Sequence, residues 1–154
     1  MRALRRQLMK LWKYIDMLLI HSPQPWIEVN RTNDRHFEGN LENWRAMEEA
    51  VKAGKVRSIG VSNFLQEDVA NIVNNGTIKP AVNQIEVHIG HVPTDLMKYC
   101  ENLGIQIEAY SPLAHGRLLK DRKINEYAKK IWRKSCTIDA CLRLATRLYR
   151  FTEE

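Results

Sequence analysis

The chain has 154 residues, of which 44% are hydrophobic and 27% are charged, and its formal net charge is +6. This length allows one domain with a sizeable core, but it falls well below the roughly 250 residues of a closed eight-stranded α/β barrel. Because no apolar run approaches the roughly 20 residues that cross a bilayer, and the basic N-terminal stretch lacks the apolar core of a signal peptide, we exclude a membrane-spanning protein and expect a cytoplasmic location.

The basic residues are concentrated towards the two ends of the chain. Positions 14–116 hold 8 Lys or Arg against 13 Asp or Glu, whereas positions 117–150 hold 11 basic against 3 acidic residues. Such an asymmetry can mark a nucleic-acid or membrane surface. No aromatic interleaving or groove-reading motif accompanies it, so we expect neither a nucleic acid nor a membrane as a partner.

The first half of the chain predicts a helix, a strand, a long loop and a second helix. Residues 2–12 place leucines at helical spacing and lead into a predicted buried strand at Tyr14–Ile20. After a long polar stretch, Asn40 is the predicted N-cap of a helix that ends just before Gly54. Loops as long as the one between them are usually functional or disordered.

The second half repeats a strand-helix unit at constant pitch. The predicted strands are 56–61, 81–87 and 105–110, and the predicted helices between them are 66–74 and 94–102. Units repeating at such an interval imply right-handed crossovers and a parallel sheet with helices on its outer face. The expected fold class is therefore α/β, with about four parallel strands and outer helices.

Polar or aromatic residues stand at the end of each predicted strand. They are His21 in the first, Ser62 and Asn63 in the second, Gln84 in the third and Tyr110 in the fourth. Taken singly, these are a capped histidine, a helix N-cap, a partner for a neighbouring backbone group and a core aromatic. Because functional groups of parallel barrels collect at the carboxyl ends of the strands, their shared position favours a site.

The cysteines and histidines have no spacing typical of a metal site. Cys100, Cys136 and Cys141 are odd in number and fit no disulfide framework. The histidines at positions 36, 88, 91 and 115 have no ligand spacing with carboxylates or thiols. We therefore predict reduced, structural thiols and no bound metal.

Four runs of sequence carry a resemblance to a known family. They are DMLLIHSP at 16–23, GKVRSIGVSNF at 54–64, PAVNQ at 80–84 and EAYSPL at 108–113. In order, spacing and strand-end placement they resemble the middle and later part of an aldo-keto reductase, especially the bacterial diketogluconate reductase-like branch. The resemblance implies a partial (β/α)8 TIM barrel over residues 1–130, truncated at both ends, followed by a divergent basic helical tail at 131–154.

The resemblance also implies a role for the strand-end residues. His21 is similar to the histidine of the family's catalytic tetrad, where a neutral imidazole orients and polarises the substrate carbonyl. Ser62, Asn63 and Gln84 resemble the residues that hydrogen-bond the nicotinamide carboxamide of NADPH, since their hydroxyl and amides offer both donors and acceptors. Tyr110 resembles the aromatic residue that stacks on the nicotinamide ring.

Two further segments belong to the implied site. Ser111, Pro112 and Leu113 resemble the start of the loop that covers the cofactor pyrophosphate. Trp26 and the polar loop that follows it are candidates for a substrate pocket, although a large aromatic residue there could equally cover the barrel rim.

The implied family activity is NADPH-dependent reduction of aldehydes or ketones to alcohols, with a small carbonyl compound as substrate. The Asp, Tyr and Lys of the family's tetrad have no counterpart in this chain, and Tyr14 lies at the opposite end of its strand from His21. Loss of a positioned general acid alone removes on the order of 10² to 10⁴ in rate. We therefore expect the isolated chain to be catalytically incomplete, with little or no activity.

Other interpretations of the chain stay open at this point. It could be a non-catalytic remnant, or a binding module that uses a basic amphipathic helix in its tail. The tail itself could derive from a shifted reading frame or from divergence. A homodimer could complete an eight-stranded barrel, since each copy would supply four strands.

Overall fold

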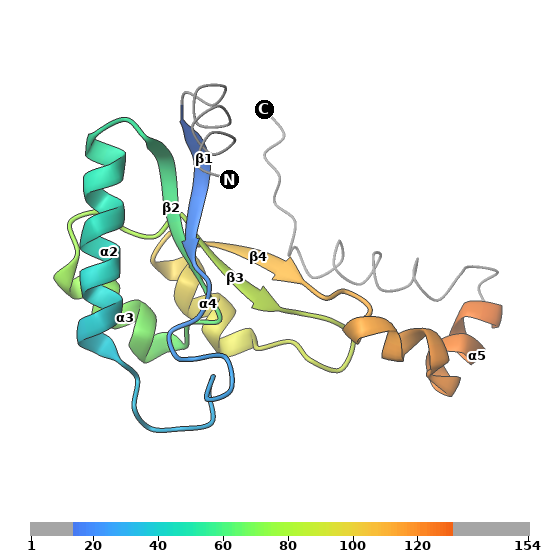
Figure 1. The fold of residues 1–154 in the computed structure, drawn as a ribbon. Helices are drawn as coiled ribbons and strands as arrows, with labels where there is room; N and C mark the ends of the chain where they lie inside the picture. Colours follow the sequence, from blue (N-terminus) through green and yellow to red (C-terminus); the bar gives the residue numbers. More distant parts are fainter. Residues whose placement is uncertain (1–13, 131–154) are drawn as a thin grey trace, which may run out of the picture.

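The structure, a computed structural model, describes residues 14–130 and contains a parallel four-stranded sheet with a layer of helices against it (Figure 1). The strands lie side by side in chain order: β1 (Ile15–Ile20), β2 (Val56–Ser62), β3 (Val82–Glu86) and β4 (Gln106–Tyr110). Helices α2 (Phe37–Lys52), α3 (Gln66–Asn75) and α4 (Thr94–Asn102) connect them, and the 3-10 helix η1 (Ala114–Lys120) and helix α5 (Arg122–Lys130) follow β4.

The predicted α/β class with four parallel strands and outer helices is confirmed. Strand and helix bounds differ from the predicted ones by one or two residues in most elements, which is the ordinary uncertainty of such ends. The predicted helix at 2–12, the predicted basic helical tail at 131–154 and two of the three cysteines lie outside the described residues.

The core lies between the sheet and helices α2 to α4. It contains Trp44, Ile59, Val61, Phe64, Val69, Ile72, Ile85, Val87 and Ile105, each at most 4% exposed. Ile59 and Val61 of β2 lie two positions apart, as do Ile85 of β3 and Val87 just after it, because side chains at alternate positions of a strand point to the same face. The remaining side chains of these strands are left for the other face and for the strand ends, where the predicted site lies.

The prediction of β1 as a buried strand is wrong. Tyr14, Ile15 and Met17 are 41%, 50% and 38% exposed. Within residues 14–130, β1 is an edge strand that pairs with β2 alone, so its apolar run is covered only where Leu18 and Ile20 pack towards the core. An apolar run predicts a strand but does not reveal how many neighbours that strand has.

The predicted N-cap Asn40 is also wrong, because α2 begins three residues earlier, at Phe37. His36 holds the N-cap position, with φ 49° and no side-chain capping bond. Asn40 is buried and its Nδ2 donates to the carbonyl oxygens of Pro23 (2.8 Å) and Arg35 (3.1 Å). The amide therefore satisfies carbonyls of the preceding loop rather than free N–H groups of the helix.

Helix α2 is joined to the turn after α3 by the side chain of Glu48. Its Oε1 accepts hydrogen bonds from the backbone N–H of Thr77 (2.6 Å) and Ile78 (2.7 Å), and the residue is only 3% exposed. Burial disfavours the charged carboxylate, but the two backbone donors and Lys52 outweigh it and hold the pKa of Glu48 below its ordinary value of 4.5.

Glu48→Gln is expected to cost about 1 kcal/mol of unfolding free energy at pH 7, since hydrogen bonds to a charged acceptor are stronger than those to a neutral one. Because the folded-state pKa is the lower one, the carboxylate stabilises the fold above the unfolded pKa, and this stability is lost as pH falls through the folded pKa. Urea unfolding between pH 7 and pH 3 measures the difference, which should shrink towards zero in acid. Glu49→Gln, at an exposed neighbouring position, is the control. A difference that is constant with pH would contradict this account.

Candidate functional site

The carboxyl ends of the four strands bring the predicted site residues to one edge of the sheet, because all four strands run in the same direction. Asn63, directly after β2, lies at the centre of the group. Its Oδ1 accepts a hydrogen bond from the Tyr110 hydroxyl (2.7 Å), and its Nδ2 donates to the His21 carbonyl (3.0 Å) and to Ser62 Oγ (3.1 Å). One amide thus links the ends of β1, β2 and β4.

Gln84 extends the same network across β3. Its carbonyl oxygen accepts hydrogen bonds from Ser62 Oγ (2.9 Å) and from the backbone N–H of Asn63 (2.9 Å). Its side-chain Nε2 donates to Glu108 Oε1 (2.9 Å), a residue that the sequence analysis did not select. Residues predicted from four separate strands therefore form one continuous hydrogen-bonded group.

The backbone at Asn63 is left-handed, with φ 61°. Asparagine tolerates this conformation better than other residues with a side chain, because its short amide can bond locally. The left-handed turn lies between the end of β2 and the start of α3, where the Asn63 side chain reaches the His21 carbonyl and the Tyr110 hydroxyl. Asparagine is therefore well suited to the left-handed turn at the centre of the candidate site.

The side chain of His21 lies beside the network rather than within it. Its ring stacks on the indole of Trp26, with centroids 5.3 Å apart and planes 7° apart. Trp26 is 65% exposed. The structure places the predicted catalytic residue and the predicted substrate residue in contact, and their roles stay predictions.

Ser111, Pro112 and Leu113 form the turn between β4 and η1. Ser111 has φ 50° and its carbonyl oxygen accepts from the backbone N–H of Ala114 (2.9 Å). Its Oγ lies 3.3 Å from His115 Nε2. The predicted cofactor loop thus starts at the strand end that carries Tyr110, next to the hydrogen-bonded group.

The electrostatic environment keeps Tyr110 protonated. Burial, and secondly the negative charge of Glu86, raise the pKa of the Tyr110 phenol. Glu86 has a buried Oε1 without a hydrogen-bond partner, 3.5 Å from His88 Nε2 and 3.8 Å from His115 Nε2. A protonated phenol is required for the hydrogen bond that Tyr110 donates to Asn63.

A buried polar cluster that was not predicted lies behind the candidate site. It consists of Gln24, Arg35, Asn40 and Asp68, which are 4%, 7%, 6% and 1% exposed. Asp68 carried one signal, since it lies three residues after Leu65, the N-cap residue of α3, and accepts from the backbone N–H of Leu65 (2.8 Å), as an acidic residue of a capping box does. Gln24 and Arg35 had no pattern that distinguished them from the rest of the polar loop, and Asn40 was predicted as an N-cap rather than as part of a buried cluster.

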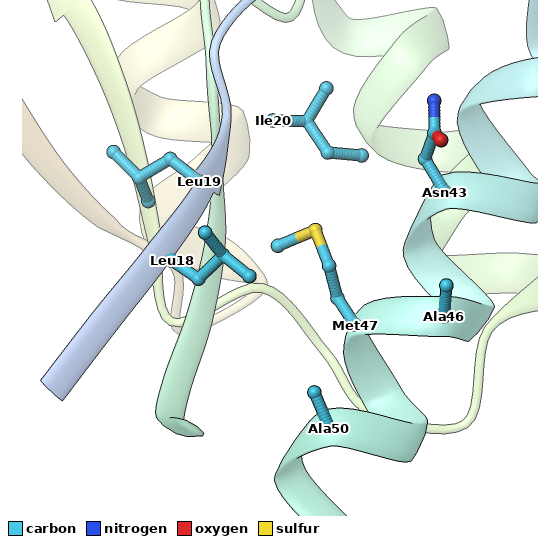
Figure 2. A pocket seen from close by; sticks show the side chains of 7 residues that line it. All are labelled: Leu18, Leu19, Ile20, Asn43, Ala46, Met47 and Ala50. Carbon is cyan, nitrogen blue, oxygen red and sulfur yellow. The ribbon is translucent and has the colours of Figure 1, made fainter. Parts of the chain in front are cut away.

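An apolar pocket of about 430 Å³ lies between β1 and α2 (Figure 2). Its lining residues are Leu18, Leu19, Ile20, Asn43, Ala46, Met47 and Ala50. Asn43 supplies the one side-chain amide, and none of these residues is titratable. The pocket therefore offers apolar contact but no group for acid-base chemistry, and it is separate from the hydrogen-bonded group at the strand ends.

The described residues contain neither a membrane-spanning helix nor a cluster of metal-binding side chains. Within residues 14–130 no helix is long and apolar enough to cross a membrane. In the same part of the chain no group of three His, Cys, Asp or Glu side chains could hold a metal ion. Cys100 is buried there, and burial, partly opposed by a hydrogen bond from Asn83, raises its pKa, so the thiol is kept in its unreactive protonated form.

Comparison with known proteins assigns the family. The model of the aldo/keto reductase family matches residues 1–151. The chain belongs to the aldo/keto reductase family. This match continues past residue 130, where we predicted the start of a divergent tail, and that boundary stays a prediction. The more specific resemblance to the diketogluconate reductase-like branch also stays a prediction.

Three aldo/keto reductase relatives illustrate the similarity. Glyoxal reductase of Bacillus subtilis is 38% identical over 117 residues, covering 76% of this chain and 38% of that protein. The crystal structure of MGS-M4, an aldo-keto reductase from a Medee basin deep-sea metagenome library, has a TM-score of 0.75 and 31% identity over 94% of this chain and 51% of its own. A mutant of Gox0644 solved in complex with NADPH has a TM-score of 0.71 and 32% identity over 94% of this chain and 50% of its own.

This chain therefore spans about two fifths to one half of the length of these aldo/keto reductases. The fold comparison confirms that its four strands and outer helices correspond to part of an aldo-keto reductase barrel. The roles of the strand-end residues stay predictions.

Proposed function

We propose that this chain carries the nicotinamide-facing part of an NADPH-dependent aldo-keto reductase site. The observation that supports this most directly is the hydrogen-bonded group at the strand ends, in which Ser62, Asn63, Gln84 and Tyr110 lie together. When bound, NADPH supplies the hydride for reduction of a carbonyl carbon. The solved relative in complex with NADPH is consistent with this cofactor.

The chemistry of the donor set fits a nicotinamide. A carboxamide needs both hydrogen-bond donors and acceptors, and the amide of Asn63, the amide of Gln84 and the hydroxyl of Ser62 provide both. The phenol ring of Tyr110 provides a flat surface of the kind that stacks on a heteroaromatic ring. In this proposal these groups orient the cofactor, and the imidazole of His21 orients the carbonyl substrate beside Trp26.

The proposed substrate class is a small aldehyde or ketone, as in the relative named glyoxal reductase. We propose that the 154-residue chain alone binds NADPH but reduces carbonyl compounds little or not at all, because no residue of this sequence matches the Asp, Tyr and Lys of the tetrad. We also propose a cytoplasmic location. We further propose that two copies pair to complete a barrel, with the β1 edge of each copy against the β4 edge of the other.

Asn63→Gly tests the cofactor assignment, since glycine accepts the left-handed backbone while removing the amide. Loss of two hydrogen bonds to the carboxamide, worth about 0.5–1.5 kcal/mol each, should weaken NADPH binding roughly tenfold. Titration of NADPH against the purified chain, followed by nicotinamide fluorescence, gives the affinity. Asn74→Ala, at an exposed position in α3, is the control and should bind like the wild type.

Two results would contradict the proposal. Absence of saturable NADPH binding by a wild-type chain that unfolds cooperatively in urea would leave only the family relationship. Equal affinities for wild type and Asn63→Gly would show that the cofactor binds elsewhere.

A further inference from the structure

We propose that Arg35 is a positioning residue for the candidate site. Its buried ion pair with Asp68 fixes the loop 21–36, which carries His21 and Trp26, against the start of α3. The loop geometry stands on the structure alone, whereas its importance for catalysis rests on the proposed function.

The loop is organised internally by the side chain of Gln24. Its Nε2 donates to Thr32 Oγ1 (3.0 Å), to the Thr32 carbonyl (3.1 Å) and to the Asp34 carbonyl (2.6 Å). Its Oε1 accepts from the backbone N–H of Asn30 (2.6 Å) and from Arg35 Nη1 (3.1 Å). A buried glutamine with both ends of its amide satisfied holds an otherwise irregular segment in one conformation.

Arg35 connects this organised loop to the rest of the fold. Its Nε donates to Asp68 Oδ1 (2.9 Å), its Nη2 donates to Asp68 Oδ2, and Nη2 also donates to Asn30 Oδ1 (3.1 Å). Asp68 in turn accepts from the backbone N–H of Leu65 at the start of α3 (2.8 Å). The planar guanidinium is suited to such a two-pronged contact, in which it bonds the carboxylate and the loop at once.

A second connection joins the same two segments at the site itself. The amide of Asn63, two residues before Leu65, donates to the His21 carbonyl (3.0 Å). The loop is therefore tied to the β2–α3 connection near its first residue by Asn63 and near its last by Arg35. Trp26 lies between these two ties and stacks on His21.

Because the ion pair is buried, its effect on the conformation of the loop 21–36 can be tested separately from its effect on the stability of the fold. Removing one partner leaves an uncompensated buried charge and destabilises strongly, whereas replacing both partners with apolar residues of similar size is often neutral or stabilising. Asp68→Asn also removes the charge left behind by Arg35→Met and, unlike an apolar residue, keeps an oxygen that can accept from the backbone N–H of Leu65, so the pair Arg35→Met and Asp68→Asn should restore part of the stability lost in Arg35→Met. It cannot restore the hydrogen bonds from Arg35 to Gln24 and Asn30 that hold the loop.

The experiment uses the full chain labelled with 5-fluorotryptophan, and Trp26→Phe assigns the Trp26 fluorine resonance. In the wild type we expect this resonance to be displaced from its position in urea-unfolded protein, because the His21 ring lies against the indole. Arg35→Met should lower the urea midpoint and remove more than half of the displacement. The double variant Arg35→Met/Asp68→Asn should recover part of the midpoint while the displacement stays lost.

Arg57→Met is the matched control, because Arg57 pairs with Asp16 at the surface, where the two side chains are 62% and 71% exposed. It should leave both the midpoint and the Trp26 resonance unchanged. Recovery of both properties in the double variant would overturn the proposal, since the pair would then be structural only. A displacement that persists in Arg35→Met, or a wild-type resonance already at its unfolded position, would overturn it as well. Because the resonance is read without NADPH, failure of the wild type to bind the cofactor would overturn the proposed function alone.

Discussion

Trp44→Ala is expected to lower the free energy of unfolding by about 3–5 kcal/mol, the usual range for removing a buried aromatic side chain. Trp44 is fully buried between α2 and the turn after α3, and its Nε1 donates to the Ile78 carbonyl (3.0 Å). Truncation would leave a large cavity and a carbonyl oxygen without its partner. The void could not collapse easily, because Glu48 holds the same turn in place from α2.

Urea unfolding of the Trp44→Ala variant, followed by circular dichroism, measures this loss. Trp26→Ala, which removes an indole that is 65% exposed, is the control and should change stability by no more than about 0.5 kcal/mol. Similar losses in both variants would mean that Trp44 is not the centre of the core.

Gly60→Val is expected to cost about 3 kcal/mol or more, the upper part of the range for overpacking. A Cβ on Gly60 would lie 2.7 Å from Val82 Cγ2, 2.8 Å from Leu19 Cδ2 and 2.8 Å from the Val82 carbonyl oxygen. Two of these atoms belong to side chains that could move, but the third is backbone of the neighbouring strand. Relief of the clash would therefore disturb the pairing of β2 with β3 that places Ser62 opposite Gln84.

The expected signature is a joint loss of stability and of NADPH affinity, measured by urea unfolding and cofactor titration. Gly39→Ala is the matched control, because a Cβ at that helical position meets nothing within 4 Å. That variant should be more stable than the wild type by about 0.5–1 kcal/mol, since alanine favours a helix over glycine. A Gly60→Val variant as stable as the wild type would show that β2 and β3 can separate at little cost.

The strand-end site was predictable because its causes are local or topological. Val, Ile and Leu runs predict strands, the intervening helices require the strands to be parallel, and parallel strands have their carboxyl ends at one edge. Asn63, Gln84 and Tyr110 could therefore be expected to lie together without any knowledge of coordinates. The hydrogen bond from Tyr110 to Asn63, across 47 positions of sequence, confirms that they do.

The features that were not predicted depend on contacts with neighbouring groups that no periodic sequence pattern indicates. Arg35 and Asp68 are 33 positions apart, and a charged residue in a polar loop is usually solvated rather than buried. Asparagine is favoured at N-caps, yet the side-chain amide of Asn40 donates to the carbonyl oxygens of Pro23 and Arg35 instead. The exposure of β1 depends on what covers it, which its own residues do not encode.

The hydrogen bond between Tyr110 and Asn63 has a consequence for ligand selection. The amide of Asn63, which is proposed to recognise a carboxamide, is already bonded to Tyr110, Ser62 and the His21 carbonyl, and the amide nitrogen of Gln84 is bonded to Glu108. A ligand that enters must exchange these internal bonds for its own, so the free energy it gains is a small difference between two well-bonded states. A ligand that lacks either a donor or an acceptor would leave some of these side chains without a hydrogen bond. The ligand-free protein, in which the internal bonds are intact, would then be favoured over the complex.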